Sequence, residues 1–280
     1  MKPLVWIASY PKSGNTWMRL ALTSLLNGGA AIDINMSRRP RDVSSFNRMI
    51  FDDLVGVESS ELTEDEILAA RPAAFRLWAA EGGGPLFLKV HEAYIDTPKG
   101  EPLFPADVSR AAIHIVRDPR DVAVSTARSY GNDIDTVIAR MANPGHVQSS
   151  TRHQVNPTLP QPLSSWSGHA ESWLDRPRFP VLTLRYEDML EDMAAALRRT
   201  AAIIGITTDD ATIDRAVMAT RFDRLRQQEE QRGFIESRTQ SSVFFFRRGI
   251  AGGWRDELTP AQAARIVTDH GPMMKRLGYI

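Results

Sequence analysis

The 280-residue sequence contains no cysteine and carries no formal net charge, because 34 basic side chains balance 34 acidic ones. The absence of cysteine excludes disulfides, thiolate zinc sites and cysteine nucleophiles, and it agrees with a reducing compartment. The charge balance provides no general attraction to polyanions, so the composition does not indicate a nucleic-acid partner.

Long apolar runs and a secretion signal are also absent. No run approaches the roughly 18 to 20 apolar residues that span a membrane, and Lys2-Pro3 leads directly into a first predicted strand. These absences predict a cytoplasmic protein without a membrane partner. With 42% hydrophobic and 24% charged residues, the chain has the composition of a globular protein with a large core.

The chain also lacks the usual nucleotide motif G-x-x-x-x-G-K-[ST]. Residues 4–26 instead predict a strand, a polar loop and a helix, with Lys12 preceding Gly14 in the loop. Backbone N–H groups and the helix dipole attract phosphate at such a helix start, and Lys12, Ser13 and Thr16 add donors. The loop lacks an evident magnesium-binding carboxylate. An ordinary strand–turn–helix connection with a surface lysine is the structural alternative.

A second predicted strand, residues 86–90, ends in polar residues. Alternation along the strand places Lys89 and His91 on the same side. Side chains at the carboxyl ends of parallel strands face the ligand crevice of open α/β sheets. His91 is therefore a candidate base that takes a proton from a hydroxyl, with the charge of Lys89 keeping it neutral. A surface histidine at a strand end is the alternative.

Residues 111–117 form the clearest predicted strand, and it ends at Arg117. The following helix carries Ser125 two turns from its start. An arginine fork and a hydroxyl that converge in this way can hold a phosphate. The alternative is a structural ion pair between Arg117 and Asp118 or Asp121.

Other segments are less regular. The pattern predicts that the helix beginning at Thr63 stops at Arg71-Pro72, and that residues 130–165 form a long irregular segment suited to acceptor recognition. Residues 223–242 predict a solvated helix or a mobile loop. The basic cluster at residues 38–41 suits a solvated loop, or an anionic acceptor. Two arginines beside a glycine-rich turn at residues 247–253 can wrap an anion.

Five motifs, in this order along the chain, resemble those of the PAPS-dependent sulfotransferases of the cytosolic type (PAPS is 3′-phosphoadenosine 5′-phosphosulfate). They are Tyr10-Pro11-Lys12-Ser13-Gly14-Asn15-Thr16-Trp17, Lys89-Val90-His91, Arg117-Asp118-Pro119-Arg120-Asp121-Val122-Ala123-Val124-Ser125, Tyr186-Glu187-Asp188 and Arg247-Arg248-Gly249-Ile250-Ala251-Gly252-Gly253-Trp254. The resemblance extends to bacterial enzymes that sulfate natural products, and it implies a bacterial member of the family.

The resemblance implies one α/β domain over residues 1–280, with a central parallel sheet flanked by helices and related to the P-loop nucleotide kinases. It also implies acceptor-lid insertions at about 36–60 and 130–165, and a cap over the nucleotide at about 223–256. The implied activity is sulfuryl transfer from PAPS (EC 2.8.2.-), with PAP as the product and no metal ion.

By the same resemblance, His91 is the catalytic base, Lys12 stabilises the leaving phosphate and Lys89 orients the sulfuryl oxygens. The residues implied to bind the co-substrate are Lys12, Ser13, Gly14, Asn15, Thr16, Trp17, Arg117, Ser125, Tyr186, Thr220, Phe222, Arg247, Arg248 and Gly249. The double-arginine clamp would favour a 3′-phosphate, because an unfilled clamp would be left with unpaired charge.

The sequence departs from the family pattern where the glycine-rich motif ends. It has Gly252-Gly253-Trp254-Arg255 instead of Gly-Asp-Trp-Lys, and it does not match the family's dimer motif, which leaves the oligomeric state open. The predicted acceptor is a small hydroxylated molecule, with a sugar or a lipid-linked acceptor as alternatives. Two other functions stay open: a P-loop small-molecule kinase that uses ATP and magnesium, and a catalytically silent PAP-binding module.

Overall fold

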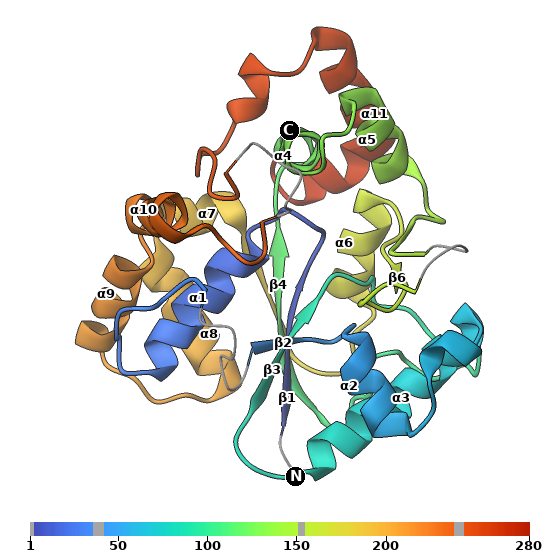
Figure 1. Cartoon of the computed structure of the whole chain (residues 1–280). Helices are drawn as coiled ribbons and strands as arrows, with labels where there is room; N and C mark the ends of the chain where they lie inside the picture. The colour runs from blue at the N-terminus through green and yellow to red at the C-terminus, as the bar shows by residue number, and fades with distance from the viewer. Residues whose placement is uncertain (1–2, 36–41, 151–154, 238–243) are drawn as a thin grey trace.

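The computed structural model describes residues 3–35, 42–150, 155–237 and 244–280 (Figure 1). At its centre lies a sheet in the order β2-β3-β1-β4-β7, and every pair of neighbouring strands is parallel. The strands are β1 (Leu4–Ser9), β2 (Asp42–Ser44), β3 (Leu86–Val90), β4 (Ser109–Val116) and β7 (Val181–Arg185). The predicted α/β fold with a central parallel sheet is confirmed.

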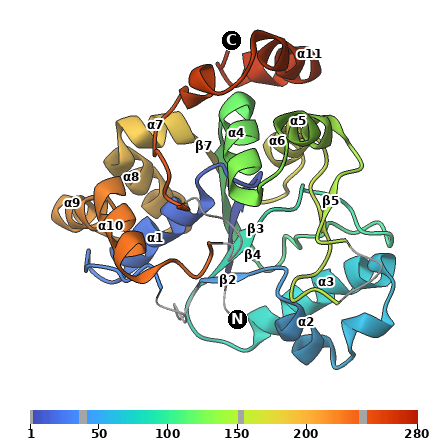
Figure 2. The same ribbon diagram turned by 45° about the horizontal axis from the view of Figure 1, so that its top comes forward.

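Helices cover both faces of this sheet (Figures 1 and 2). On one face, Val5 and Ile7 of β1 pack against α1 (Asn15–Leu26), α8 (Met193–Ile204) and α9 (Asp210–Ala219). On the other face, Trp6 packs with residues of α3 (Glu64–Ala80) and α6 (Trp166–Asp175). Burial on both faces explains why β1 is a continuous apolar run without alternation.

The remaining elements surround the carboxyl ends of the strands. They are α2 (Arg48–Val55), α4 (Pro119–Tyr130), α5 (Ile134–Ala142), α7 (Tyr186–Glu191), α10 (Phe222–Arg232), α11 (Pro260–Arg276), the short 3₁₀ helices η1 (Ser59–Glu61) and η2 (Gly253–Asp256), and the hairpin strands β5 (Val147–Gln148) and β6 (Gln161–Pro162). α4, α5 and α11 pack together beyond the upper end of β4 in Figure 1. None of the helices in the described ranges is long and apolar enough to cross a membrane.

The predicted helix stop at Arg71-Pro72 is wrong, because α3 continues unbroken to Ala80. Proline removes one backbone hydrogen bond and ordinarily ends or kinks a helix. Here Pro72 itself is buried, and Phe75 and Trp78 in the following turns belong to the core beneath the sheet. Burial of this face outweighs the lost hydrogen bond.

The expectation of one long irregular segment at residues 130–165 is also wrong in part. Asp133 caps α5 by accepting a hydrogen bond from the Thr136 N–H, and Val137, Ile138 and Met141 are buried. The turn residues around this short helix hid its amphipathic pattern. Of the two predictions for residues 223–242, the helix is correct as far as Arg232, and the basic cluster at residues 38–41 lies outside the described residues.

Candidate active site

A cavity of about 430 Å³ opens beside the carboxyl ends of the central strands. Most of the residues that the sequence implied for co-substrate binding or catalysis line it: Lys12, Gly14, Asn15, Thr16, Trp17, Lys89, His91, Arg117, Ser125, Tyr186, Phe222, Arg247, Arg248 and Gly249. The two others, Ser13 and Thr220, are fully buried behind its wall. The fold therefore brings five distant motifs to one place.

The loop between β1 and α1 forms the floor of the cavity. Gly14 is the N-cap of α1 and has a φ of 104°, which favours glycine. A Cβ atom at Gly14 would lie 2.7 Å from the Tyr186 ring, so a side chain does not fit there. The Asn15 amide donates hydrogen bonds to Ile7 O (2.8 Å) and Ser9 Oγ (3.2 Å), and so ties the helix start to β1. The unpaired N–H groups of the helix start suit an anion.

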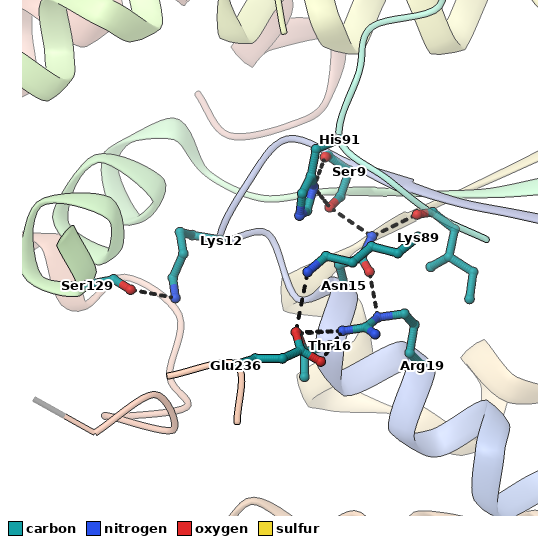
Figure 3. Close-up of polar contacts among 10 residues, drawn as sticks. Ser9, Lys12, Asn15, Thr16, Arg19, Lys89, His91, Ser129 and Glu236 are labelled. Carbon is teal, nitrogen blue, oxygen red and sulfur yellow. Dashed lines mark hydrogen bonds and ion pairs between the residues drawn. The ribbon is translucent and has the colours of Figure 1, made fainter. Parts of the chain in front are cut away.

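His91 follows β3, and its ring is 9% exposed. Its Nδ1 lies 2.8 Å from the carbonyl oxygen of Ser9 (Figure 3). Because a carbonyl oxygen only accepts, Nδ1 carries the proton and Nε2 keeps a lone pair. The ring stacks on Phe46 with 5.9 Å between centroids. Burial, followed by the charge of Lys89, holds the pKa of His91 well below its usual value, so the imidazole is neutral.

The two predicted catalytic lysines have different surroundings. Lys12 Nζ donates to Ser129 Oγ on α4 (3.1 Å) and lies 4.2 Å from the centre of the Phe245 ring. Lys89 Nζ lies 3.3 Å from a carboxylate oxygen of Glu236. Figure 3 shows Lys12 directed toward Ser129, away from His91, with Lys89 between His91 and Glu236.

Glu236 is a site residue that the sequence analysis missed. Its carboxylate accepts hydrogen bonds from Thr16 Oγ1 (3.2 Å) and from Arg19 Nη2 (2.7 Å), in addition to its ion pair with Lys89. The sequence showed no carboxylate at the loop, because Glu236 comes from 220 residues further along the chain. Arg19 and Lys89 neutralise this carboxylate, so the local charge pattern does not favour binding of a magnesium ion there.

Arg117 does not form the structural ion pair that was the alternative reading. Its guanidinium donates to Lys12 O (3.1 Å) and Ile250 O (3.2 Å), and lies 4.3 Å from the centre of the Tyr186 ring. Its Nε is buried and has no hydrogen-bond partner in the described parts of the chain. Arg117 thus bridges the floor loop and the segment after Arg248, and it retains a donor for an anion.

The two acids next to Arg117 have other partners. Asp118 forms an ion pair with Arg120 (2.7 Å). Asp121 accepts hydrogen bonds from the backbone N–H groups of Gly252 (2.7 Å) and Trp254 (2.9 Å). These contacts leave Arg117 as a ligand-binding candidate and make Asp121 an anchor for the glycine-rich turn.

The expectation that an unfilled pair of arginines carries unpaired charge is wrong. Arg247 forms an ion pair with Glu257 (2.7 Å), and Arg248 forms one with Asp256 (2.8 Å). Both side chains line the cavity nonetheless. A 3′-phosphate would therefore compete with these acids for the arginines, and the clamp would be selective through the strength of bidentate phosphate contacts. Gly249, which directly follows Arg248, has a φ of 61°, a left-handed conformation that favours glycine.

Aromatic rings form another wall of the cavity. The Trp17 indole N–H donates to the carbonyl oxygen of Thr220 (2.9 Å), and its ring meets Tyr186 edge to face. Thr220 thus supports Trp17 from behind the wall. The Phe222 ring packs directly against Gly249, where a side chain would collide with it. This apolar slot beside a cluster of cations suits a nucleotide base next to its phosphates.

The chain is similar to known proteins over nearly its whole length. Residues 2–278 match the family model described as "Sulfotransferase domain". Sulfotransferase 1A1 of Canis lupus familiaris is 26% identical over 278 residues, which cover 97% of this chain and 83% of that protein.

Two solved structures are similar in fold. Retinol dehydratase in complex with androsterone and PAP has a TM-score of 0.64 at 22% identity, over 98% of this chain and 82% of that one. A mouse sulfotransferase complexed with PAP has a TM-score of 0.61 at 19% identity, over 98% and 84%. The chain belongs to the sulfotransferase family, whose enzymes transfer a sulfuryl group from PAPS.

Proposed function

We propose that this enzyme transfers the sulfuryl group of PAPS to a hydroxyl group of a small molecule, with His91 as the base. The observation that carries the proposal is the tautomer of His91, whose Nδ1 proton is committed to Ser9 O. Nε2 is thereby left as the basic atom of a neutral imidazole in the wall of the cavity. The androsterone bound to retinol dehydratase supports a small hydroxylated acceptor.

The donor groups of the cavity fit PAPS. The floor loop offers helix-start N–H groups, Lys12 and Thr16 to a phosphosulfate. Arg117, with its buried unpartnered Nε, lies with Arg248 on the side that would hold the 3′-phosphate.

Each residue then has a defined task. The co-substrate, when bound, supplies a sulfuryl group joined to a phosphate leaving group. His91 Nε2 accepts the proton of the acceptor hydroxyl as its oxygen forms the new O–S bond, and the electron pair of the broken S–O bond leaves with the phosphate of PAP. Lys12 stabilises the charge on that phosphate, and Lys89 orients the sulfuryl oxygens. Positioning and charge stabilisation carry most of the catalysis, as in phosphoryl transfer.

Two alternatives differ in their use of the same cavity. A kinase would need ATP and magnesium, and the Glu236 carboxylate beside Thr16 is already paired with Arg19 and Lys89. A silent PAP-binding module would not need a neutral histidine with a basic nitrogen in the cavity wall. Neither alternative explains the arrangement of His91 as directly as sulfuryl transfer does.

Calorimetric titration with PAP and with AMP, which lacks the 3′-phosphate, tests the donor. We expect PAP to bind at least tenfold more tightly than AMP, because Arg117 and the arginine pair gain a phosphate partner. ATP with magnesium serves as the comparison for the kinase. Equal affinities for PAP and AMP, or phosphorylation of an acceptor by ATP, would contradict the proposal.

A further inference from the structure

A set of polar side chains forms the wall of the cavity near His91. Gln148, Ser149, Thr158 and Gln161 all line the cavity, and we call these four residues the polar wall. Gln148 and Gln161 are paired across the antiparallel hairpin of β5 and β6. The family motifs do not include any of these residues, and the nucleotide-binding loop and the arginines lie on other elements.

Backbone hydrogen bonds fix the polar wall beside the proposed base. The Leu159 N–H donates to Phe46 O (2.9 Å), and the ring of Phe46 stacks on His91. The Ala93 N–H donates to Pro162 O (2.9 Å), two residues beyond His91. The segment leading into β6 is thus bound to the ring partner of His91, and β6 is bound to the chain that follows His91, so the polar wall lies beside His91 in the same cavity.

Three residues of the polar wall form a hydrogen-bonded network that leaves one buried atom without a partner among the described residues. Ser149 Oγ accepts hydrogen bonds from Thr158 Oγ1 (3.0 Å) and Gln161 Nε2 (3.4 Å). The Gln161 side chain is 1% exposed, and its Oε1 has no hydrogen-bond partner in the described ranges. Leaving a buried acceptor without a hydrogen bond is unfavourable. A ligand that donates a hydrogen bond to Gln161 Oε1 would remove this cost.

The backbone conformation of Ser149 also indicates a ligand-binding site. Its φ of 63° lies in the left-handed region, which costs free energy for a residue other than glycine. This conformation places Oγ where both Thr158 and Gln161 reach it. Such strained residues cluster at ligand-binding sites.

We propose that the acceptor is a polyhydroxylated molecule, such as a sugar or a glycosylated compound; this inference rests on the proposed sulfuryl transfer. One hydroxyl of the acceptor reacts at His91, and another binds the amide of Gln161. A hydroxyl both donates and accepts hydrogen bonds, so it can satisfy the unpaired carbonyl oxygen and the network around Ser149 together. A flat phenol or a steroid would cover the polar wall without pairing it, which is unfavourable.

A matched pair of probes tests this inference: 4-methylumbelliferone, a phenol, and its β-D-glucoside, which carries only sugar hydroxyls. We expect the PAP-loaded enzyme to bind the glucoside at least tenfold more tightly by calorimetry, and to sulfate it with PAPS at a higher kcat/KM. Gln161→Leu should lower kcat/KM for the glucoside about tenfold or more and leave that for the phenol unchanged or raised. Thr158→Val, which removes a hydroxyl without changing shape, should act in the same direction.

The control is Gln231→Leu, which makes the same change at an exposed position of α10 outside the cavity wall. PAP affinity, measured for each variant, shows that the donor site and the fold are intact. Preference for the phenol, or equal loss for both probes in Gln161→Leu and Thr158→Val with PAP binding retained, would overturn the inference and leave the proposed function standing. Failure of the unmodified enzyme to bind PAP would instead contradict the proposed function itself.

Discussion

At the scale of single residues, the state of His91 follows from two neighbours. Ser9 O fixes the proton on Nδ1, and burial together with Lys89 depresses the pKa of the ring. A neutral imidazole is the form that acts as a base, so the usual loss of base activity near pH 6.5 should not occur. The same hydrogen bond orients the ring, so that Nε2 does not depend on substrate binding for its position.

His91→Ala is expected to reduce kcat by about 10²- to 10⁴-fold, the usual contribution of a general base. PAP affinity should be unchanged within twofold, because no phosphate ligand is removed. Steady-state kinetics with PAPS and an acceptor probe measure kcat, and calorimetry with PAP measures the affinity. A kcat within tenfold of the unmodified enzyme would remove His91 from the mechanism.

The unmodified enzyme should keep a constant kcat/KM for the acceptor between pH 7.5 and 6, since the pKa of His91 in the free folded enzyme lies well below its usual value. A pH profile of kcat/KM checks this expectation. An inflection near pH 6.5 that is lost only in His91→Ala would show that this imidazole titrates at its usual pKa, and it would contradict the expectation.

At the scale of elements, two buried carboxylates hold the two ends of the segment that carries Arg247, Arg248 and the glycine-rich turn. Glu229 of α10, 4% exposed, accepts from the N–H groups of Phe245 (2.6 Å) and Phe246 (2.8 Å), directly before Arg247. Asp121 of α4 holds the other end at Gly252. The turn that would carry the phosphate clamp is therefore positioned by one buried carboxylate from each of two helices, α10 and α4.

Glu229→Gln tests this anchor. The amide accepts only one of the two backbone hydrogen bonds, and a buried N–H left unsatisfied costs about 1–3 kcal/mol. We expect KM for PAPS to rise about tenfold with kcat little changed, because Arg247 is displaced and His91 is not. Glu171→Gln, which makes the same change at an exposed position of α6 outside the cavity wall, is the control and should have no effect. An equal fall in kcat for Glu229→Gln would mean that the turn also aligns the reacting groups.

The elements also mark how far the sequence determines the site. The floor loop, His91 and Arg117 were predictable, because each follows its own strand within a few residues and strand ends meet at one edge of a parallel sheet. Glu236 was not, because its partners lie more than 140 residues away along the chain. The anchor at Glu229 was not either, because the segment between it and Phe245 contains no periodic pattern. α5 and the β5–β6 hairpin escaped notice for another reason: both are too short for periodicity to separate them from a loop.

At the scale of the whole molecule, the histidines couple the fold to pH. His114 and His169 are fully buried, and burial is the main cause that lowers the pKa of His169 to about 3 and that of His114 well below its usual value. Burial also lowers the pKa of His270 to about 4. In the unfolded chain each of these rings titrates near pH 6.5.

Below pH 6.5 the unfolded state therefore binds protons that the folded state does not, so the free energy of unfolding should fall as the pH decreases. Each such ring contributes a slope that rises from about 0.7 kcal/mol per pH unit at pH 6.5 to about 1.4 near pH 5, and its full contribution to stability is reached about one pH unit above 6.5. Urea unfolding at pH 7.5, 6 and 5 measures the slope of the free energy of unfolding against pH. His114→Asn should reduce this slope by the contribution of one ring. A free energy of unfolding that is constant from pH 7.5 to 5 would mean that the buried rings accept protons in the folded enzyme. The neutral His91 on which the proposed mechanism depends would then need direct measurement of its own titration.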